Sequence, residues 1–287
     1  MRKAGWAILA VLVVGIGVWA HGLVNPFDLE PSARAAGYGG AFCGLAEGSD
    51  ALLYNPGALI LPHRPEFSSD YMSQLGGLSS VVWLAGASGN WAGAIAYLSA
   101  GGIETEPGGD ALAFNQVGVA LAGAWELGGL PLPLPLRLGV GATLRYVRAQ
   151  LADKAGSGLS LGLGALGIVD VGAASFRVGI AMDDLGFGIG FGEDVPREAW
   201  SVGIRLGAAL VLPNFKLDMD YGGGLRFGLG FSFNPAFELR AGIALEGGMT
   251  RFALGLGFGW RSFTLDYALI THPLLPSSHR FGFGFSF

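Results

Sequence analysis

The stretch LRFGLGFSF at residues 225–233 decides the fold, because large apolar side chains fill every second position. A β-strand points successive side chains to opposite faces, so this stretch predicts one apolar face and one made of Arg, Gly and Ser. The same pattern returns in FALGLGFGW at 252–260 and in FGFGFSF at 281–287. A shift of one residue would put every Phe in the wrong solvent, so the register is strongly specified.

The alternation extends backwards along the chain, for example in LRLGVGATLRY at 136–146. We expect about fourteen strands, and an even count returns both chain ends to one side of a membrane, as in bacterial barrels. The expected strands are 65–73, 77–87, 91–101, 113–127, 135–150, 157–170, 174–184, 198–212, 214–221, 224–233, 235–246, 249–258, 261–270 and 279–287.

The connections between these strands predict an orientation. With a periplasmic N-terminus, the tight turns fall on the periplasmic side and the longer loops outside, which is the usual arrangement. The tight turns are 88–90, 213–214 and 234–235, and the longer loops are 101–112, 185–197 and 271–278. The Pro-rich loop at 128–134 does not fit this assignment.

Composition leads to the same fold class. The 287 residues include 51 Gly, 51% are hydrophobic and only 14% are charged, whereas ordinary soluble domains carry about 25% charged residues. Helical membrane proteins need runs of about 20 apolar residues, and the only candidate is at the extreme N-terminus. The sequence therefore predicts an all-β, antiparallel transmembrane β-barrel in a bacterial outer membrane.

Charge and cysteine content exclude several classes of function. The net charge is −5 and no basic tract is present, so nucleic acid is not an expected partner. Cys43 is the only cysteine, which excludes an intramolecular disulfide and a zinc site built on thiolates. We expect no metal and no cofactor.

The first twenty residues have the features of an export signal. Arg2 and Lys3 precede an apolar run at 7–18, and residues 18–20 (VWA) place small residues at both ends of a cleavage triplet. This order predicts a cleaved signal peptide at 1–20, with an uncleaved anchor as the alternative.

The inward face of the predicted barrel is rich in Gly and in charges of both signs. The Gly residues either mark bends and close backbone approach or leave room for something inside. Mixed charge inside a barrel usually forms paired or solvated networks, and a specific polar ligand site is the alternative. The charged residues are Arg137, Arg145, Lys216, Asp218, Asp220, Arg226, Glu238, Arg240, Arg251, Asp266 and Arg280.

A segment without strand alternation precedes the first strand. It contains ARAAGYGGAF at 33–42 and AEGSDALLYNPGAL at 46–59, in which small residues dominate. Ser49 or Asp50 is placed to cap a short helical turn that ends at Asn55-Pro56. We expect residues 21–62 to form a plug inside the lumen and residues 63–287 to form the barrel.

These two runs, together with LDYALITHPLLPSSHRFGFGFSF at 265–287, resemble the FadL-like superfamily of outer-membrane proteins. The resemblance is closest to its PorV/PorQ-like branch. It implies a fourteen-stranded barrel with an N-terminal hatch. In long-chain fatty-acid transporters of the superfamily, an Asn-Pro-Ala element lies in that hatch and its movement admits hydrophobic cargo. Asn55 and Pro56 match this element, and Gly57 departs from the usual Ala.

The resemblance implies binding or transport of hydrophobic small molecules such as long-chain fatty acids. The hatch residues would be Arg34, Asp50, Asn55, Pro56 and Gly57. Alternatively, Asn55-Pro56 forms a plain turn, and Arg34 and Asp50 are paired within the lumen, since buried charges must be paired. The chain and its loops are short for a fatty-acid transporter. A second interpretation is therefore a non-transporting scaffold or a secretion-associated (type IX-like) component.

Two features at the C-terminus complete the predictions. Phe287 ends an alternating strand and resembles the signal read by the outer-membrane insertion machinery. His272 and His279 flank the loop at 271–278 and are the best candidates for a catalytic or metal-binding pair. We expect neither a nucleophile elbow of the Gly-x-Ser-x-Gly type nor a His-Glu-x-x-His motif. The expected partners are membrane lipid, a hydrophobic ligand and the insertion machinery, and no enzymatic activity is expected.

Overall fold

The structure is a computed structural model that describes residues 25–104, 111–128, 136–151, 154–191 and 197–287. The predicted signal peptide and the start of the expected plug lie outside the described residues. So does most of the Pro-rich loop that did not fit the orientation assignment.

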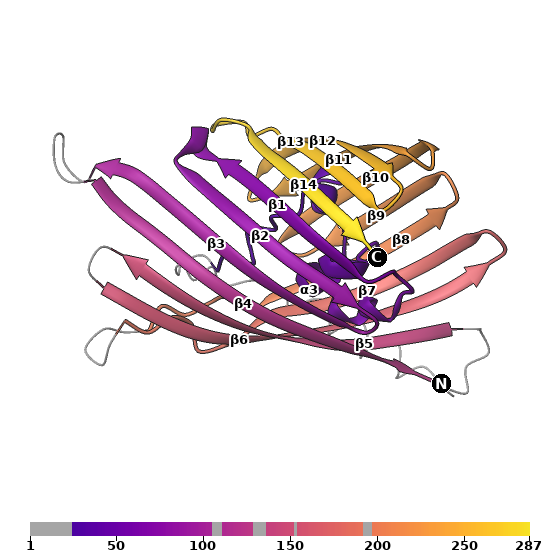
Figure 1. Cartoon of the computed structure of the whole chain (residues 1–287), viewed down its shortest axis with the longest axis horizontal. Coiled ribbons are helices and arrows are strands. Elements are labelled where there is room, and N and C mark those ends of the chain that lie inside the picture. The colour runs from indigo at the N-terminus through magenta and orange to yellow at the C-terminus, as the bar shows by residue number, and fades with distance from the viewer. Residues whose placement is uncertain (1–24, 105–110, 129–135, 152–153, 192–196) are drawn as a thin grey trace.

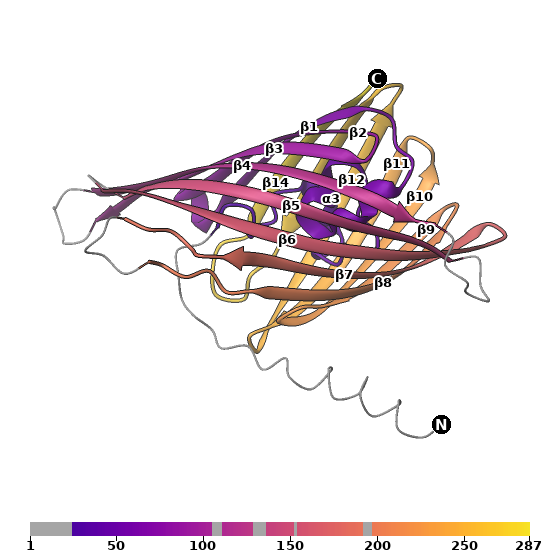
Figure 2. The same cartoon turned by 90° about the horizontal axis from the view of Figure 1, so that it is seen from below.

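Fourteen antiparallel strands form a closed barrel, in which β1 pairs with both β2 and β14 (Figures 1 and 2). This confirms the predicted strand count. The strands are β1 Glu66–Gln74, β2 Ser79–Ser88, β3 Trp91–Glu104, β4 Ala111–Leu127, β5 Leu136–Leu151, β6 Lys154–Val171, β7 Ala174–Gly186, β8 Gly203–Leu212, β9 Phe215–Tyr221, β10 Gly224–Asn234, β11 Phe237–Glu246, β12 Met249–Trp260, β13 Phe263–Ile270 and β14 Ser278–Ser286.

The alternation read from residues 225–233 is the alternation of the wall. On β10, Phe227, Leu229 and Phe231 are exposed on the outside, while Gly228 and Gly230 are buried on the inside. The register pairs Gly228 with Gly242 on β11 and with Asp218 on β9. The apolar set of each strand therefore lies on one outer surface, as the sequence predicts.

The outer surface carries aromatic side chains in two groups. Beyond Tyr146 on β5 the next outward residues are Arg148 and Gln150, so the apolar surface ends near this tyrosine. Aromatic belts with polar residues beyond them mark the interfaces of membrane barrels. The exposed tyrosines are Tyr71, Tyr97, Tyr146 and Tyr221, with the half-buried Tyr267, and exposed aromatic residues toward the opposite strand ends are Trp91, Trp125, Phe233, Phe237, Trp260 and Phe263.

The wall is uneven in height. Strands β4 to β6 have 16 to 18 residues, whereas β9 and β13 have 7 and 8. A membrane-spanning strand needs about 9–11 residues. In Figure 1 the long strands β3 to β6 extend well past the shorter strands on one side of the barrel.

The N-terminal segment, residues 25–64, lies against the inward faces of the strands. It contains α2 (Ala33–Gly37), η1 (Gly48–Asp50), α3 (Ala51–Tyr54) and η2 (Pro56–Ile60). Helix η2 packs on β4, β5 and β6, whereas α2 packs on β11 to β14. Figure 2 shows α3 surrounded by the ring of strands. Among the described residues, no helix is long and apolar enough to cross a membrane.

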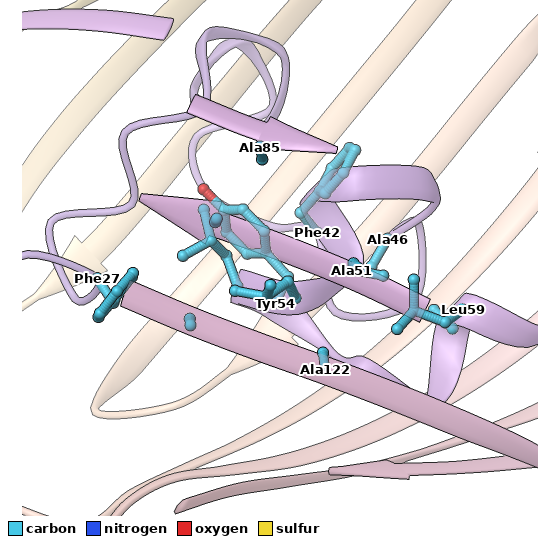
Figure 3. Close-up of a cluster of buried hydrophobic side chains, with 14 of the residues drawn as sticks. Phe27, Phe42, Ala46, Ala51, Tyr54, Leu59, Ala85 and Ala122 are labelled. Carbon is cyan, nitrogen blue, oxygen red and sulfur yellow. The ribbon is translucent and has the colours of Figure 1, made fainter. Parts of the chain in front are cut away.

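Apolar side chains join this segment to the wall. The rings of Phe42 and Tyr54 meet edge to face at 5.4 Å, and Phe27 meets Trp83 of β2 at 5.9 Å. Figure 3 shows Phe27, Phe42 and Tyr54 in one cluster with small wall residues such as Ala85 and Ala122. Small inward residues on the wall leave the volume that these aromatic rings fill.

The inward glycines have the second of the two predicted roles, because they make room for the N-terminal segment. A Cβ on Gly141 would lie 2.5 Å from the Pro56 carbonyl carbon, and one on Gly242 would lie 2.2 Å from the Gly39 nitrogen. Real Cβ atoms do not approach backbone this closely. The wall at these positions therefore accepts only glycine while the segment is in place.

Two local expectations are wrong. Strand β8 begins at Gly203 rather than at 198, and Trp200, which lies within the expected strand, is buried with 7% exposure. Gly188, at a φ of +68°, lets the chain fold back so that Trp200 packs over Gly158.

The capping expectation also fails. Helix α3 begins and ends as expected, but neither Ser49 nor Asp50 makes the capping hydrogen bond. The Ser49 hydroxyl donates to Glu66 of β1 at 2.9 Å, and Asp50 pairs with Arg34. Both side chains instead bond residues outside the helix.

The glycine contacts predict that Gly141→Ala destabilises the folded protein by about 1–3 kcal/mol, because the new methyl group forces the Pro56 backbone away. Thermal unfolding of the refolded barrel in detergent measures the change. Gly203→Ala is the matched control, since a Cβ there meets nothing within 4 Å. Equal stability of the two variants would contradict the account of the inward glycines.

Candidate functional site

Asn55 is the hydrogen-bonding centre of the predicted hatch element. It is fully buried, and its amide Nδ2 donates to the Cys43 carbonyl at 3.2 Å and to the Ala165 carbonyl of β6 at 3.0 Å. Its Oδ1 accepts from the Gly57 N–H at 3.1 Å, which caps η2. Pro56 occupies the first turn of η2, where its missing N–H is not needed. Asn55 therefore joins two parts of the segment to the wall.

The wall explains why position 57 is glycine. A Cβ on Gly57 would lie 2.8 Å from the Ala165 Cα and 2.9 Å from the Gly139 carbonyl oxygen. The usual Ala of the Asn-Pro-Ala element would therefore collide with β5 and β6. The Gly at this position therefore follows from the close contact between the turn and the wall.

Arg34 and Asp50 form an ion pair, with Arg34 Nη2 2.6 Å from Asp50 Oδ2. Arg34 Nη1 also lies 3.4 Å from Glu47. Burial raises the pKa of Asp50, and the nearby Arg34 guanidinium opposes this rise. The two residues are thus paired in the lumen, which was the alternative to a hatch role, and Asn55 belongs to a separate set of contacts.

Two small cavities among the described residues lie between the segment and the wall. One of about 20 Å³ is lined by Tyr38, Phe42 and Arg177, among others. The other, of about 160 Å³, is polar and lies beside Ser32, Arg34, Asp50 and Asp266. Typical small-molecule sites occupy about 300–1,000 Å³, so neither cavity holds a drug-sized molecule while the segment is in place.

Carboxylates of the wall accept hydrogen bonds from the backbone of the segment. Asp220 Oδ2 accepts the N–H groups of Phe42 and Cys43 at 2.8 and 2.9 Å. Asp218 Oδ2 accepts those of Gly44 and Leu45 at 3.1 and 3.0 Å. These bonds satisfy N–H groups that have no strand partner.

Strand β1 supplies two more acceptors, which the sequence reading did not identify. Asp70 accepts the Ala33 N–H at 2.8 Å, and Glu66 accepts the Ser49 N–H at 2.6 Å. Their spacing of four residues puts both on one face of the strand, and this was the available signal.

Glu30 is the most connected charge of the segment and was also missed. Its carboxylate accepts from Arg226 Nη1 at 2.8 and 3.0 Å and from Arg205, and its carbonyl accepts from Arg280. Burial alone would raise the pKa of Glu30, but Arg205, Arg226 and Arg280 outweigh it and lower the pKa to about 2. No local sequence pattern around residue 30 predicts this role.

The remaining predicted residues lie elsewhere. Phe287 is 74% exposed on the outside, and its N–H donates to the Pro65 carbonyl at 2.9 Å. His272 accepts backbone N–H groups within its own loop, whereas His279 bonds the Tyr267 hydroxyl at 2.9 Å. The two histidines therefore do not form a joint site in the described structure, and no metal-binding cluster occurs among the described residues.

The run GLSLG at 158–162 has the spacing of a nucleophile elbow but lies within β6. An elbow requires a sharp turn between a strand and a helix. The Ser160 hydroxyl instead donates to Asp184 at 2.9 Å, beside the bond from Asn25 to the same carboxylate. Ser160 thus belongs to the contacts that hold the start of the segment.

No protein-family model and no curated protein sequence matches this chain. Solved structures match in fold. The toluene transporter TbuX of Ralstonia pickettii is 12% identical with a TM-score of 0.59, over 91% of this chain and 100% of that one. The toluene transporter TodX of Pseudomonas putida is 10% identical with a TM-score of 0.53, over 91% and 98%. A FadL homologue of Pseudomonas aeruginosa is 9% identical with a TM-score of 0.50, over 88% and 97%.

These likenesses show a shared barrel fold, since the identities are too low to show more. They agree with the FadL-like part of the sequence resemblance at the level of fold. The PorV/PorQ-like branch remains a resemblance of the two end motifs.

The lowered pKa of Glu30 predicts an acid-sensitive contact. Because the folded pKa lies below the ordinary 4.5, Glu30 stabilises the folded state above pH 4.5. That contribution is lost as the pH falls toward about 2. The melting temperature of the native chain minus that of Glu30→Gln should be largest above pH 4.5 and shrink as the pH falls through about 2. A difference that does not change with pH would contradict the assignment.

Proposed function

We propose that this chain is an outer-membrane barrel that binds or transports hydrophobic small molecules, with long-chain fatty acids as one candidate class. In this proposal residues 1–20 are a cleaved signal peptide, residues 21–62 a plug, and residues 63–287 the barrel. The hatch is formed by Asn55, Pro56 and Gly57. Solved barrels of the same fold are described as toluene transporters and as a FadL homologue, which supports the class of cargo.

The outer surface supports a place in the outer membrane. Exposed Leu, Phe and Val cover the strands, and aromatic residues gather toward both ends of the wall. Phe287 closes an alternating strand that pairs with β1, which suits recognition by the insertion machinery. Membrane lipid is then the solvent of the outer face.

The single observation that carries the hatch proposal is the position of Asn55. It bonds the Cys43 carbonyl within the segment and the Ala165 carbonyl of the wall. Since the cavities beside the segment are small, hydrophobic cargo passes only when the segment moves. Movement requires these two bonds to break, so Asn55 controls access.

The filled lumen also favours a second candidate function. Carboxylates of β1 and β9 bond the segment backbone at six N–H groups, which would suit a barrel that stays closed. Such a barrel would act as an outer-membrane scaffold or as a secretion-associated, type IX-like component. Stable co-purifying protein partners and no uptake would favour this role.

Uptake into reconstituted vesicles tests the transporter proposal. We expect vesicles with the native chain to take up a labelled long-chain fatty acid and to exclude a small polar solute. The variant Asn55→Ala, Pro56→Ala should raise the fatty-acid uptake about tenfold, because the bonds that hold the segment on the wall are absent. Loss of a buried hydrogen bond costs about 1–3 kcal/mol, enough to disorder the hatch.

The chain offers a matched control in its exposed Asn234-Pro235 turn. The Asn234 side chain accepts only from its own turn, from Ala236 and Phe237. Asn234→Ala, Pro235→Ala should leave uptake unchanged. If the native chain takes up neither solute, the transporter proposal is overturned and the scaffold role is favoured.

A further inference from the structure

Four arginines lie on the inward side of the wall along one half of the barrel. Each is the third residue of its strand, and the strands β8, β10, β12 and β14 all run in the same direction. They therefore lie near the same end of the barrel, which is the outer end if the N-terminus is periplasmic. We call this set the arginine collar: Arg205, Arg226, Arg251 and Arg280.

The collar holds more positive charge than the carboxylates that contact it. Arg205 and Arg226 share Glu30, while Arg226 and Arg251 share Glu246. Asp220 faces Arg226 across β9 and β10, but its Oδ2 already accepts two backbone N–H groups. Three guanidinium groups thus share two carboxylates, and the fourth, that of Arg280, contacts only the Glu30 carbonyl.

Hydrogen-bond donors around Glu30 are left over. Arg205 Nη1, Arg280 Nε and the Tyr54 hydroxyl are buried and have no partner among the described residues. Arg280 is 8% exposed and Tyr54 is fully buried, with the Arg205 guanidinium 5.3 Å from the Tyr54 ring centre. Buried donors without acceptors are costly, so the collar suits a ligand richer in acceptor oxygens than Glu30 in its present position.

Glu30 itself belongs to the N-terminal segment and not to the wall. Its φ is +50°, a left-handed conformation that is unfavourable for a residue with a Cβ. Such strain persists only where surrounding contacts hold it, and here the collar supplies them. Its side chain is 18% exposed, so water reaches it.

The residue before Glu30 provides an apolar partner for this carboxylate. Leu29 packs against a separate cluster of Met72, Val81 and Leu98 on β1 to β3. Leu29 and Glu30 together place an apolar group on an apolar surface and a carboxylate among arginines. This is the pattern of an amphiphile with an acidic headgroup.

We propose that the arginine collar is the receptor for the carboxylate headgroup of an amphiphilic cargo, and that Leu29-Glu30 occupies it as an internal surrogate until cargo exchanges with it. The inference rests on the proposed function and names the charge of its cargo. Exchange frees residues near 30 from the wall, and it leaves the Asn55 contacts to break separately.

Binding to the full chain in nanodiscs tests the exchange, with labelled decanoate, 1-decanol and butyrate as probes and empty discs subtracted. Glu30→Gln removes the competing charge and keeps the side-chain shape. An internal occupant lowers the apparent affinity of a ligand in proportion to the fraction of molecules whose site is free. Removal of the occupant removes this reduction. We expect the preference for decanoate over decanol to rise about tenfold.

Adding Arg226→Met to Glu30→Gln should lower decanoate affinity about tenfold or more, because a charge-assisted hydrogen bond is lost. In the double variant residue 30 is uncharged, so loss of Arg226 leaves no Glu30 carboxylate unpaired. Heat-modifiable migration on gels checks that the barrel is folded. Asp170→Asn, on the exposed end of β6, is the net-charge control and should change neither affinity. Butyrate should bind far more weakly than decanoate.

The outcomes separate the two proposals. If decanol and decanoate bind but Glu30→Gln leaves their ratio unchanged, the surrogate role is overturned and hydrophobic transport stands. If butyrate binds as well as decanoate, the collar takes small carboxylates and the amphiphile assignment is overturned. If no hydrophobic probe binds to any variant, the proposed function fails, and the exchange fails with it.

Discussion

The need to bond every backbone N–H and C=O group away from water governs both parts of this molecule. In the wall the need is met by neighbouring strands, and pairing of β1 with β14 leaves no free edge. The N-terminal segment has an irregular backbone inside that wall and no strand to pair with. Its N–H groups are accepted instead by carboxylates that project inward, such as Asp218 and Asp220. The buried acids are therefore the counterpart, inside the lumen, of the ladder hydrogen bonds in the wall.

Glycine and carboxylate positions on the inward face depend on each other. Carboxylates hold the segment only if its backbone comes close, and it comes close only where the wall has no side chain. Gly207 shows the coupling, since a Cβ there would lie 2.4 Å from Asp220 Oδ1 and 2.7 Å from the Cys43 Cβ. The high glycine content of the chain is thus partly explained by the close contact between the N-terminal segment and the inward face of the wall.

Sequence alone was sufficient for the wall and only partly sufficient for the site. Alternation in runs such as 225–233 has a period fixed by strand geometry, so it predicted the strands and their faces. The alternation did not predict the burial of Trp200, because the positive φ of Gly188 turns the chain near Trp200 inward. Glu30 was beyond sequence reasoning, because its partners Arg205 and Arg226 lie 175 and 196 positions away. Closure of the barrel brings these residues together, and no local sequence pattern predicts which distant residues meet.

The segment is held by two kinds of contact that respond to different causes. Around Glu30 the contacts join full charges, so a competing anion or a proton weakens them. Around Asn55 they join an amide to two carbonyls, which neither of these affects. The two sets contact the wall on separate strands, β6 against β8, β10 and β14, so loss of one does not by itself remove the other. In the proposed function, a solute that acts on Glu30 therefore loosens the segment without opening the barrel, and passage requires the neutral contacts at Asn55 to break as a second step.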